Sequence, residues 1–482
     1  MDIPSLFMIP SAVSSGKVHS VFPNSTDADF DFNRDSSATR VNSQGLIEEV
    51  GYFGSELVAN GNFADNSWWQ LSSSNVNISN GKGNFTAGTT EYFYKTNTLT
   101  IGKQYKLVYE ITDYTTGYIS AFGGNWSSPP LLSGGVGTYV RYFTCIDTTF
   151  GLVGNTFRGS IDNVSVKEVT GDRARLNYEI EGGLVNTKPS LLLEPQSTNL
   201  VTYSEDFSQW SVAGTITRTY NYRISPDGTI NSTRVVFSGA NEQIYKDFSS
   251  TSGVTGSIYI KGESGKTIKF GLSGAESLFT LNGEWQRITK YISGSTSRIT
   301  LNTYSGATAR DIEVFGGQAE ALSYATSYIP TNGSTQTRAA ETCNGAGTSS
   351  ILPSEEGILY IDMTGLADDG TARTFSINNT VSNRVFIQLR STTGQVNSGV
   401  VVSGSLQGSS LSHNISQTSN IKAAFRYKSS DYKFYVNGSQ VASQSSGNTF
   451  SAGTLNDISF DSGDGAEDFY GKIRDIRVYN TK

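Results

Sequence analysis

Apolar and polar residues alternate in three similar stretches of the chain, which read SIDNVSVKE at 160–168, ARDIEVFG at 309–316 and IRDIRVYN at 473–480. When Val164, Ile312 and Ile476 are set level, each is followed two positions later by a valine. A period of two is that of a β-strand with one buried and one exposed face. The copies lie about 150 to 165 residues apart, much further than the units of a solenoid. We therefore expect each stretch to be the last strand of a whole β domain, with three such domains in series.

Other alternating runs predict further strands inside each domain. They include QYKLVYEIT at 104–112, TGSIYIKG at 255–262, ILYIDMTG at 358–365 and DYKFYVNGSQVA at 431–442. In the last run, Asn437-Gly438 indicates a two-residue hairpin, because a type I′ turn needs positive φ at two successive residues. With 51 glycines, 11% aromatic residues and only 16% charged residues, the composition favours short strands and tight turns over helices. The expected fold class is all-β, built of serial antiparallel β-sandwiches.

Charge, hydropathy and cysteine content narrow the classes of partner and compartment. The net charge is −7 and no Lys/Arg cluster occurs, which argues against nucleic-acid binding. No apolar stretch reaches 18 residues, so membrane insertion is not expected. The N-terminal run MDIPSLFMIPSAV lacks a basic leader and does not resemble a secretory signal. Cys145 and Cys343 fall in different predicted domains, so we expect two free, buried thiols and synthesis in a reducing cytoplasm.

Three peptides resemble a module of bacteriophage proteins. They read SSATRVNSQGLIEEV at 36–50, PSLLLEPQSTNLVTYSEDFSQW at 189–210 and YIPTNGSTQTRAAETCNGAG at 328–347. The module that they resemble is common in tail- and capsid-associated proteins of tailed bacteriophages. In those relatives the first two peptides follow one another directly, whereas here a segment of about 115 residues stands between them. The resemblance therefore implies that 57–170 is an inserted domain, and that the short N-terminal segment is completed by the chain beyond this insert.

The remaining parts are similar to carbohydrate-binding jelly rolls and to laminin-G or concanavalin-A-like sandwiches. Together the resemblances imply a discontinuous virion-docking module of 1–56 with 171–200, an inserted jelly roll of 57–170, a second jelly roll of 201–337, a linker of 338–350 and a laminin-G or concanavalin-A-like sandwich of 351–482.

The resemblance also implies a function. We expect a non-enzymatic structural protein on the surface of a phage virion, such as a head fibre, a capsid decoration or a tail appendage, made in the host bacterial cytoplasm. It would bind capsid or tail proteins, form a homo-oligomer such as a trimer, and attach to cell-surface or mucus glycans. The alternatives are a polysaccharide-degrading tailspike-type enzyme and a purely structural decoration without a ligand. A bacterial adhesin fits less well, because an adhesin needs an export signal.

Few residues point to catalysis. His19 and His413 fall in different predicted domains, and no Ser/His/Asp or Cys/His constellation, HExxH motif or P-loop is recognisable. Two carboxylates would suffice for a glycosidase, but no pair stands out among the 43 acidic residues. The sequence therefore favours a protein that is not an enzyme.

One tryptophan is the main candidate for glycan contact. Trp126 stands in FGGNWSSPP, between Gly-Gly and Pro-Pro, which predicts an exposed loop. Its ring could stack on the apolar face of a sugar, and Tyr114 and Tyr118 of TDYTTGY could join it. Packing within the loop is the alternative for Trp126.

The other tryptophans are expected in hydrophobic cores. Trp68 or Trp69, and likewise Trp210, follow a phenylalanine at matching positions near the start of two predicted sandwiches. Trp285 lies in the alternating run GEWQRIT, which also favours a core position.

The acidic run DSGDGAED is a candidate calcium loop. Asp461, Asp464, Glu467 and Asp468 supply oxygen ligands at spacings that a calcium site can use. A solvated turn is the alternative, and no other cofactor is expected.

Overall fold

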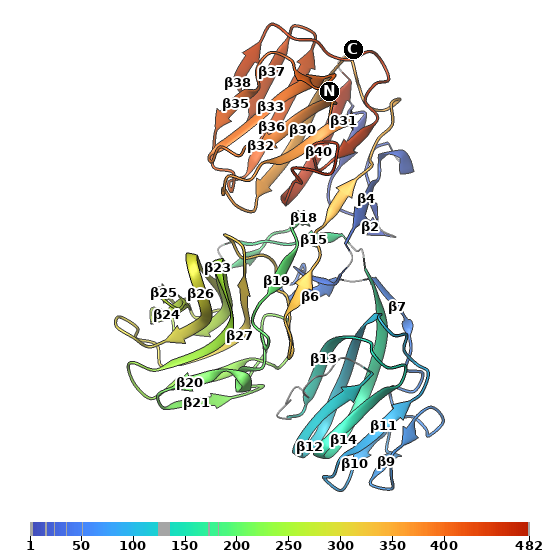
Figure 1. Ribbon diagram of the computed structural model, residues 1–482, viewed down its shortest axis with the longest axis vertical. Helices are drawn as coiled ribbons and strands as arrows, with labels where there is room; N and C mark the ends of the chain where they lie inside the picture. The colour runs from blue at the N-terminus through green and yellow to red at the C-terminus, as the bar shows by residue number, and fades with distance from the viewer. Residues whose placement is uncertain are drawn as a thin grey trace. The chain divides into compact units, whose positions relative to one another are not determined.

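The computed structural model describes residues 3–14, 17–23, 25–34, 36–50, 52–123, 135–171, 174–181 and 183–480 (Figure 1). The chain divides into two compact units. Unit 1 consists of Met1–Val50, Asp172–Gln196 and Ala339–Lys482, and unit 2 of Gly51–Gly171 and Ser197–Arg338. Each of the two stretches of unit 2 is thus inserted in the sequence of unit 1.

The described residues fold almost entirely as antiparallel strands. The helical turns among them are the 3₁₀ turns η1 (Thr26–Ala28) and η2 (Phe207–Gln209). The predicted all-β class of serial antiparallel β-sandwiches is confirmed. No helix in the described ranges is long and apolar enough to cross a membrane.

Unit 1 contains two large sheets. The first has eight strands in the order β15-β18-β40-β30-β36-β37-β38, with β1 beside β40. The second has six strands in the order β34-β33-β32-β31-β39, with β35 beside β33. Smaller sheets are β2-β3-β4-β29, β5-β6 and β16-β17. The strands of unit 1 are β1 (Leu6–Met8), β2 (Val13–Ser14), β3 (Lys17–Val18), β4 (Phe30–Asn33), β5 (Ala38–Val41), β6 (Ile47–Val50), β15 (Arg175–Asn177), β16 (Ile180–Glu181), β17 (Leu184–Val185), β18 (Ser190–Leu193), β29 (Thr342–Asn344), β30 (Glu356–Gly365), β31 (Arg373–Thr380), β32 (Asn383–Leu389), β33 (Gln395–Val402), β34 (Ser405–Leu406), β35 (Leu411–Asn414), β36 (Ile421–Lys428), β37 (Tyr432–Val436), β38 (Ser439–Gln444), β39 (Asp457–Ser459) and β40 (Gly471–Asn480).

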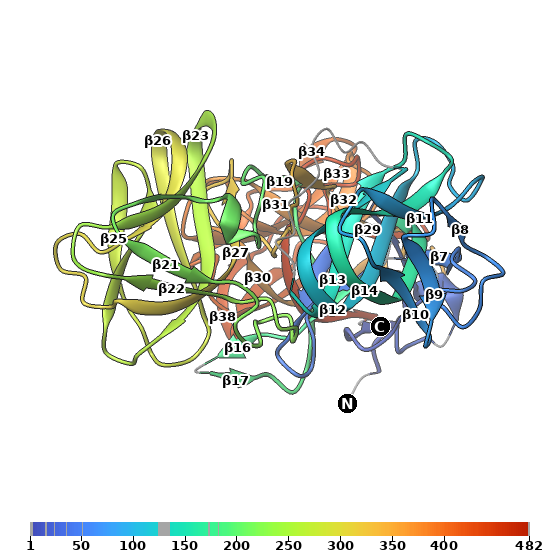
Figure 2. The same cartoon turned by 90° about the horizontal axis from the view of Figure 1, so that it is seen from below.

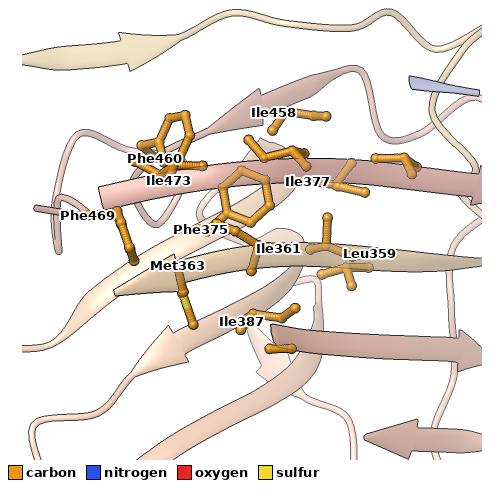
Figure 3. Close-up of a cluster of buried hydrophobic side chains, with 14 of the residues drawn as sticks. Leu359, Ile361, Met363, Phe375, Ile377, Ile387, Ile458, Phe460, Phe469 and Ile473 are labelled. Atoms are coloured by element: carbon orange, nitrogen blue, oxygen red, sulfur yellow. The ribbon is translucent and has the colours of Figure 1, made fainter. Parts of the chain in front are cut away.

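The two large sheets of unit 1 share one hydrophobic core. Leu359 and Ile361 of β30 and Phe375 and Ile377 of β31 are fully buried and lie close together (Figure 3). In β36 every second side chain is buried, as strand geometry requires when one face of a sheet meets a core. Full burial of each such apolar side chain stabilises the fold by roughly 1.5–3 kcal/mol.

This core also takes in parts of the chain that lie far from 351–482 in sequence. Leu6 of β1 and Leu191 of β18 are buried in it, because both strands pair with β40 and widen its sheet. The segment 338–350, predicted to be a linker, contains β29, whose Cys343 is fully buried. The segments 1–50, 172–196 and 339–482 thus belong to one compact unit. The N-terminal strands obtain a core by completing the sheets of the C-terminal sandwich.

A cluster of charged side chains is buried in unit 1, and we call it the buried ion cluster: Arg34, Arg175, Glu194 and Glu341. Glu341 accepts hydrogen bonds from Arg34 Nη1 at 2.7 Å and from Arg175 Nε at 2.8 Å. Arg175 Nη1 also lies 2.8 Å from Glu194 Oε2. The cluster connects all three chain segments of unit 1 close to the positions where the chain leaves or re-enters this unit.

The first sandwich of unit 2 is residues 52–171. Its sheet has the order β13-β12-β14-β10-β9, with β7 and β11 beside β14 and β8 beside β11. The rings of Phe63 and Trp69 stack with centroids 5.2 Å apart in its core, so the predicted core role of Trp69 is confirmed. Its strands are β7 (Tyr52–Glu56), β8 (Gln70–Leu71), β9 (Val76–Ser79), β10 (Lys82–Phe85), β11 (Glu91–Lys95), β12 (Gln104–Phe122), β13 (Gly137–Thr144) and β14 (Phe150–Gly171).

The second sandwich of unit 2 is residues 197–338 (Figure 2). Its sheet has the order β21-β22-β27-β23-β26-β24-β25, with β20 beside β23. Phe207 and Trp210 pack in its core with ring centroids 4.7 Å apart, which confirms the predicted core role of Trp210. Its strands are β19 (Ser197–Asn199), β20 (Ser211–Ala213), β21 (Ile216–Thr219), β22 (Thr233–Phe237), β23 (Gln243–Gly262), β24 (Thr267–Leu272), β25 (Ala275–Thr280), β26 (Gln286–Asn302), β27 (Asp311–Glu320) and β28 (Gln336–Arg338).

The three similar stretches all form strands. They lie in β14, β27 and β40, each of which pairs with neighbours on both sides. The aligned residues Val164, Ile312 and Ile476 are buried, and so is the valine two positions after each. The alternation therefore predicted these buried positions correctly, although in β27 the intervening Glu313 and Phe315 are buried as well. The expectation of two free, buried cysteines is also confirmed.

Candidate functional site

The second sandwich carries an open groove that combines aromatic and charged side chains. We call it the Trp285 groove, with a volume of about 460 Å³, lined by Tyr222, Arg223, Ile224, Ile230, Lys261, Trp285 and Glu313. An adjoining hollow of about 740 Å³ shares four of these residues and continues past Arg234, Lys266 and Asp311. Most of the residues that line the groove and the hollow come from β22, β23 and β27 and from the loops before β22 and β26. A rigid sheet thus supports a surface whose aromatic groups are supplied by loops.

One wall of the groove is a small hairpin built on the turn Ser-Pro-Asp-Gly at 225–228. The Asp227 side chain accepts a hydrogen bond from the Ser225 hydroxyl at 2.6 Å, and Gly228 adopts a φ of 82°. Aspartate and glycine favour such a turn, because one bonds the local backbone and the other tolerates positive φ. Ile224 and Ile230 face each other across the hairpin and remain exposed. The turn therefore holds an apolar ridge beside the groove.

Trp285 lies at the groove and not in a core. Its side chain is half-buried, and its indole Nε1 donates a hydrogen bond to the carbonyl of Ile224 at 3.2 Å. The prediction of a core position is wrong. Trp285 immediately precedes β26, in which Ile288 is buried, so the period of two puts Trp285 on the opposite face with Arg287. The run GEWQRIT contained this signal, since its tryptophan and isoleucine are an odd number of residues apart.

Two arginines surround the second aromatic residue of the groove. The guanidinium carbons of Arg223 and Arg234 lie 4.7 and 5.3 Å from the centroid of the Tyr222 ring. Arg234 makes two hydrogen bonds to Asp311, at 2.9 and 2.6 Å, and these bonds raise the pKa of its guanidinium. Arg223 lies 3.4 Å from Glu313 and is largely exposed. Tyr222 is therefore held in place from the Arg234 side, while Arg223 is only loosely tied.

The polar groups of the groove can bind hydroxyls as well as charges. Glu313 also accepts a hydrogen bond from the Ser232 hydroxyl at 3.2 Å. Lys261 lies 3.2 Å from Glu284, whose side chain is 81% exposed. An open groove with two aromatic rings and movable polar side chains can take the apolar face of a ring-shaped ligand and bond its polar edge.

The residues that the sequence suggested for glycan contact are not those that line the Trp285 groove. Trp126 lies outside the described residues. Tyr114 and Tyr118 lie on β12, where the pairing with β14 shifts register. Tyr114 is 38% exposed, and its ring packs 6.2 Å from that of Phe157, while Tyr118 is half-buried. Neither tyrosine is part of the Trp285 groove.

The acidic run 461–468 forms a turn in which each carboxylate has its own hydrogen-bond donor. Asp461 accepts from the amide of Gly463 at 2.5 Å, Asp464 from the Ser462 hydroxyl at 2.5 Å, Glu467 from the Thr374 hydroxyl at 2.8 Å and Asp468 from the Tyr470 hydroxyl at 3.0 Å. No group of three or more His, Cys, Asp or Glu side chains that could hold a metal ion occurs within the described residues. The geometry therefore favours the turn over the calcium loop.

Comparisons with known proteins do not assign the chain to a family. No protein-family profile matches it, and no curated protein matches it. Among solved structures 34 chains match, one of which is the Ruminococcus gnavus IT-sialidase CBM40 bound to alpha2,3 sialyllactose. That protein is 18% identical with a TM-score of 0.24, and the match covers 28% of this chain and 80% of the other. Both values are too low for the likeness to say what the present chain binds.

Proposed function

We propose that the chain is a non-enzymatic binding protein whose second sandwich recognises carbohydrate through the Trp285 groove. The observation that carries the proposal is the pairing of Trp285 and Tyr222 with exposed polar side chains in one open groove. Sugar rings have an apolar face and a rim of hydroxyls, and an amphipathic aromatic ring beside hydrogen-bonding groups complements both.

The charge pairing in the groove favours binding over catalysis. Asp311 and Glu313 lie two residues apart on β27, and each is paired with an arginine. A glycosidase needs one carboxyl group that stays protonated and a second that is free to act as nucleophile or base. Asp311, which accepts two hydrogen bonds from Arg234, suits neither role. An assay for new reducing ends after incubation with polysaccharide tests this step, and their release by the wild-type chain would overturn it.

We further propose that the chain is displayed on the surface of a tailed-phage virion as a head fibre, capsid decoration or tail appendage. The support is the resemblance of 36–50, 189–210 and 328–347 to a module of such proteins. Several displayed copies would let weak single sites hold a particle on a cell surface or on mucus by avidity. An antibody against the chain should label intact particles, and unlabelled particles would contradict this location.

A glycan array with the purified chain tests the groove. Trp285→Ala should lower binding at least about tenfold, as removal of a central aromatic contact does at other binding sites. Tyr291→Ala is the matched control, because Tyr291 is an exposed aromatic residue of the same sandwich that does not line the groove. Binding that survives Trp285→Ala but is lost with Trp126→Ala would move recognition to the first sandwich. Binding that is unchanged in both variants would refute both sites.

A further inference from the structure

The groove has a charge opposite to that of the whole chain. Of the side chains that line the adjoining hollow, which shares Arg223, Lys261 and Glu313 with the groove, five are Arg or Lys and three are Asp or Glu, whereas the chain carries a net charge of −7. A concave surface with an excess of one charge concentrates ligands of the opposite charge. A neutral sugar would make no use of this excess.

Two of the cations can change partner at little cost. Arg223 is 63% exposed and only 3.4 Å from Glu313, and Lys261 is paired with the highly exposed Glu284. The Lys261–Glu284 pair is exposed and contributes little to stability, and the 3.4 Å contact of Arg223 with the buried Glu313 is long for a charge-assisted hydrogen bond. If Arg223 turned to a ligand, Glu313 would keep its hydrogen bond from Ser232. Arg234 differs, because its two bonds to Asp311 fix it in place.

We infer that the preferred ligand of the Trp285 groove is a saccharide that carries a carboxylate, such as a polymer of uronic acids. The inference rests on the proposed function and deepens it by naming the ligand class. Trp285 and Tyr222 receive the apolar face of the sugar ring, and Arg223 and Lys261, which line both hollows, receive its carboxylate. A planar guanidinium suits this task because it can bond both carboxylate oxygens.

The test compares one polyuronate with the same polymer after its carboxyl groups have been reduced to alcohols. We expect the full chain to bind the native polymer at least about tenfold more tightly, with a preference that weakens as salt rises. Equal binding of the two polymers would overturn the inference and leave the proposed function intact. Binding of neither polymer, together with a blank glycan array, would remove the proposed function as well.

Single-residue variants test whether Arg223 and Lys261 bind the carboxylate of the saccharide. Arg223→Gln and Lys261→Gln should each reduce the preference for the native polymer while binding of the reduced polymer stays within about twofold. Arg298→Gln is the matched control in the same sandwich, because Arg298 also lies over a tyrosine, Tyr245, and pairs with an aspartate, Asp247, but does not line the groove. An unchanged preference in the Arg223→Gln/Lys261→Gln double variant would contradict the inference. So would equally tight binding of dextran sulfate, which would indicate attraction to any polyanion.

Discussion

Glu341 in unit 1 and Glu313 in the Trp285 groove both pair with arginine, but their surroundings differ. Glu341 is almost completely buried and takes hydrogen bonds from two arginines that are themselves fully buried. Glu313 is also largely buried, but its arginine partner, Arg223, is mostly in solvent. Taking charges out of water is costly unless every partner is present, whereas charges at the surface exchange partners easily. The first arrangement suits a fixed junction, and the second suits a surface that must accept a ligand.

The position of the buried ion cluster explains why unit 1 needs such a junction. Its members come from all three segments of this unit: Arg34 from the first, Arg175 and Glu194 from the second, and Glu341 from the third. Two sandwiches interrupt the sequence between these segments, so no short turn brings them together. Correct assembly of the three segments satisfies all four charges at once, and a missing segment leaves at least one charge buried without its partner.

The largest effect is expected from neutralising the acidic centre of this cluster. Glu341→Gln preserves the shape of the side chain but leaves Arg34 and Arg175 with too little negative charge. Removing one partner of a buried ionic group typically costs about 3–5 kcal/mol of stability. Hydrogen exchange of β30 and β40 should show this loss in unit 1.

An internal control exists for this experiment. All five tryptophans lie in unit 2, so denaturation followed by tryptophan fluorescence reports on that unit alone. Its midpoint should be unchanged in Glu341→Gln. A loss below about 1 kcal/mol in unit 1 would mean that the cluster contributes no more than a surface ion pair.

The fold class and the buried faces could be predicted from the sequence because strand periodicity is a local signal. Val164, Ile312 and Ile476 all proved buried at the positions that the alternation indicated. Which chain segments make up unit 1 could not be predicted in the same way. The pairing of β1 and β18 with β40 joins residues hundreds of positions apart, and nothing in a short run such as LFM at 6–8 specifies its partner.

The candidate site was only partly accessible from the sequence. Trp285 was visible as an aromatic residue in a strand-like run, and the parity of its distance from Ile288 indicated the exposed face. The convergence of Tyr222, Arg223 and Lys261 on it depends on the long-range pairing of β22, β27 and β23. Polar and aromatic residues in loops follow no periodic pattern from which their spatial neighbours could be predicted.

A partly exposed carboxylate in the first sandwich should show an intermediate effect. Hydrogen bonds from Ser72, Ser73 and Asn75 lower the pKa of Glu91 to about 2. A lowered pKa stabilises the fold above the unfolded value of about 4.5, and this contribution is lost as pH falls toward 2. After allowance for solvent screening, Glu91→Gln should cost about 1 kcal/mol at pH 7.

The pH dependence distinguishes this effect from a simple loss of packing. The stability difference between Glu91→Gln and the wild-type chain, measured by hydrogen exchange of β11 and β14, should shrink between pH 4.5 and pH 2. A difference that stays constant with pH would assign the role of Glu91 to shape and not to charge.

The smallest effect is expected at the fixed ion pair of the groove, Arg234 and Asp311. A double-mutant cycle with Arg234→Gln and Asp311→Asn should give a coupling energy smaller than either effect above, because both side chains are partly in solvent. The coupling should fall further as salt is raised, whereas the cost of Glu341→Gln should respond little to salt because that cluster is shielded from water. A coupling that matched the loss in Glu341→Gln and was insensitive to salt would show that Arg234 and Asp311 are tied as rigidly as the buried ion cluster. In that case Arg234 would hold its side of the Tyr222 ring as firmly as the buried ion cluster holds its members, and partner exchange would be confined to Arg223 and Lys261.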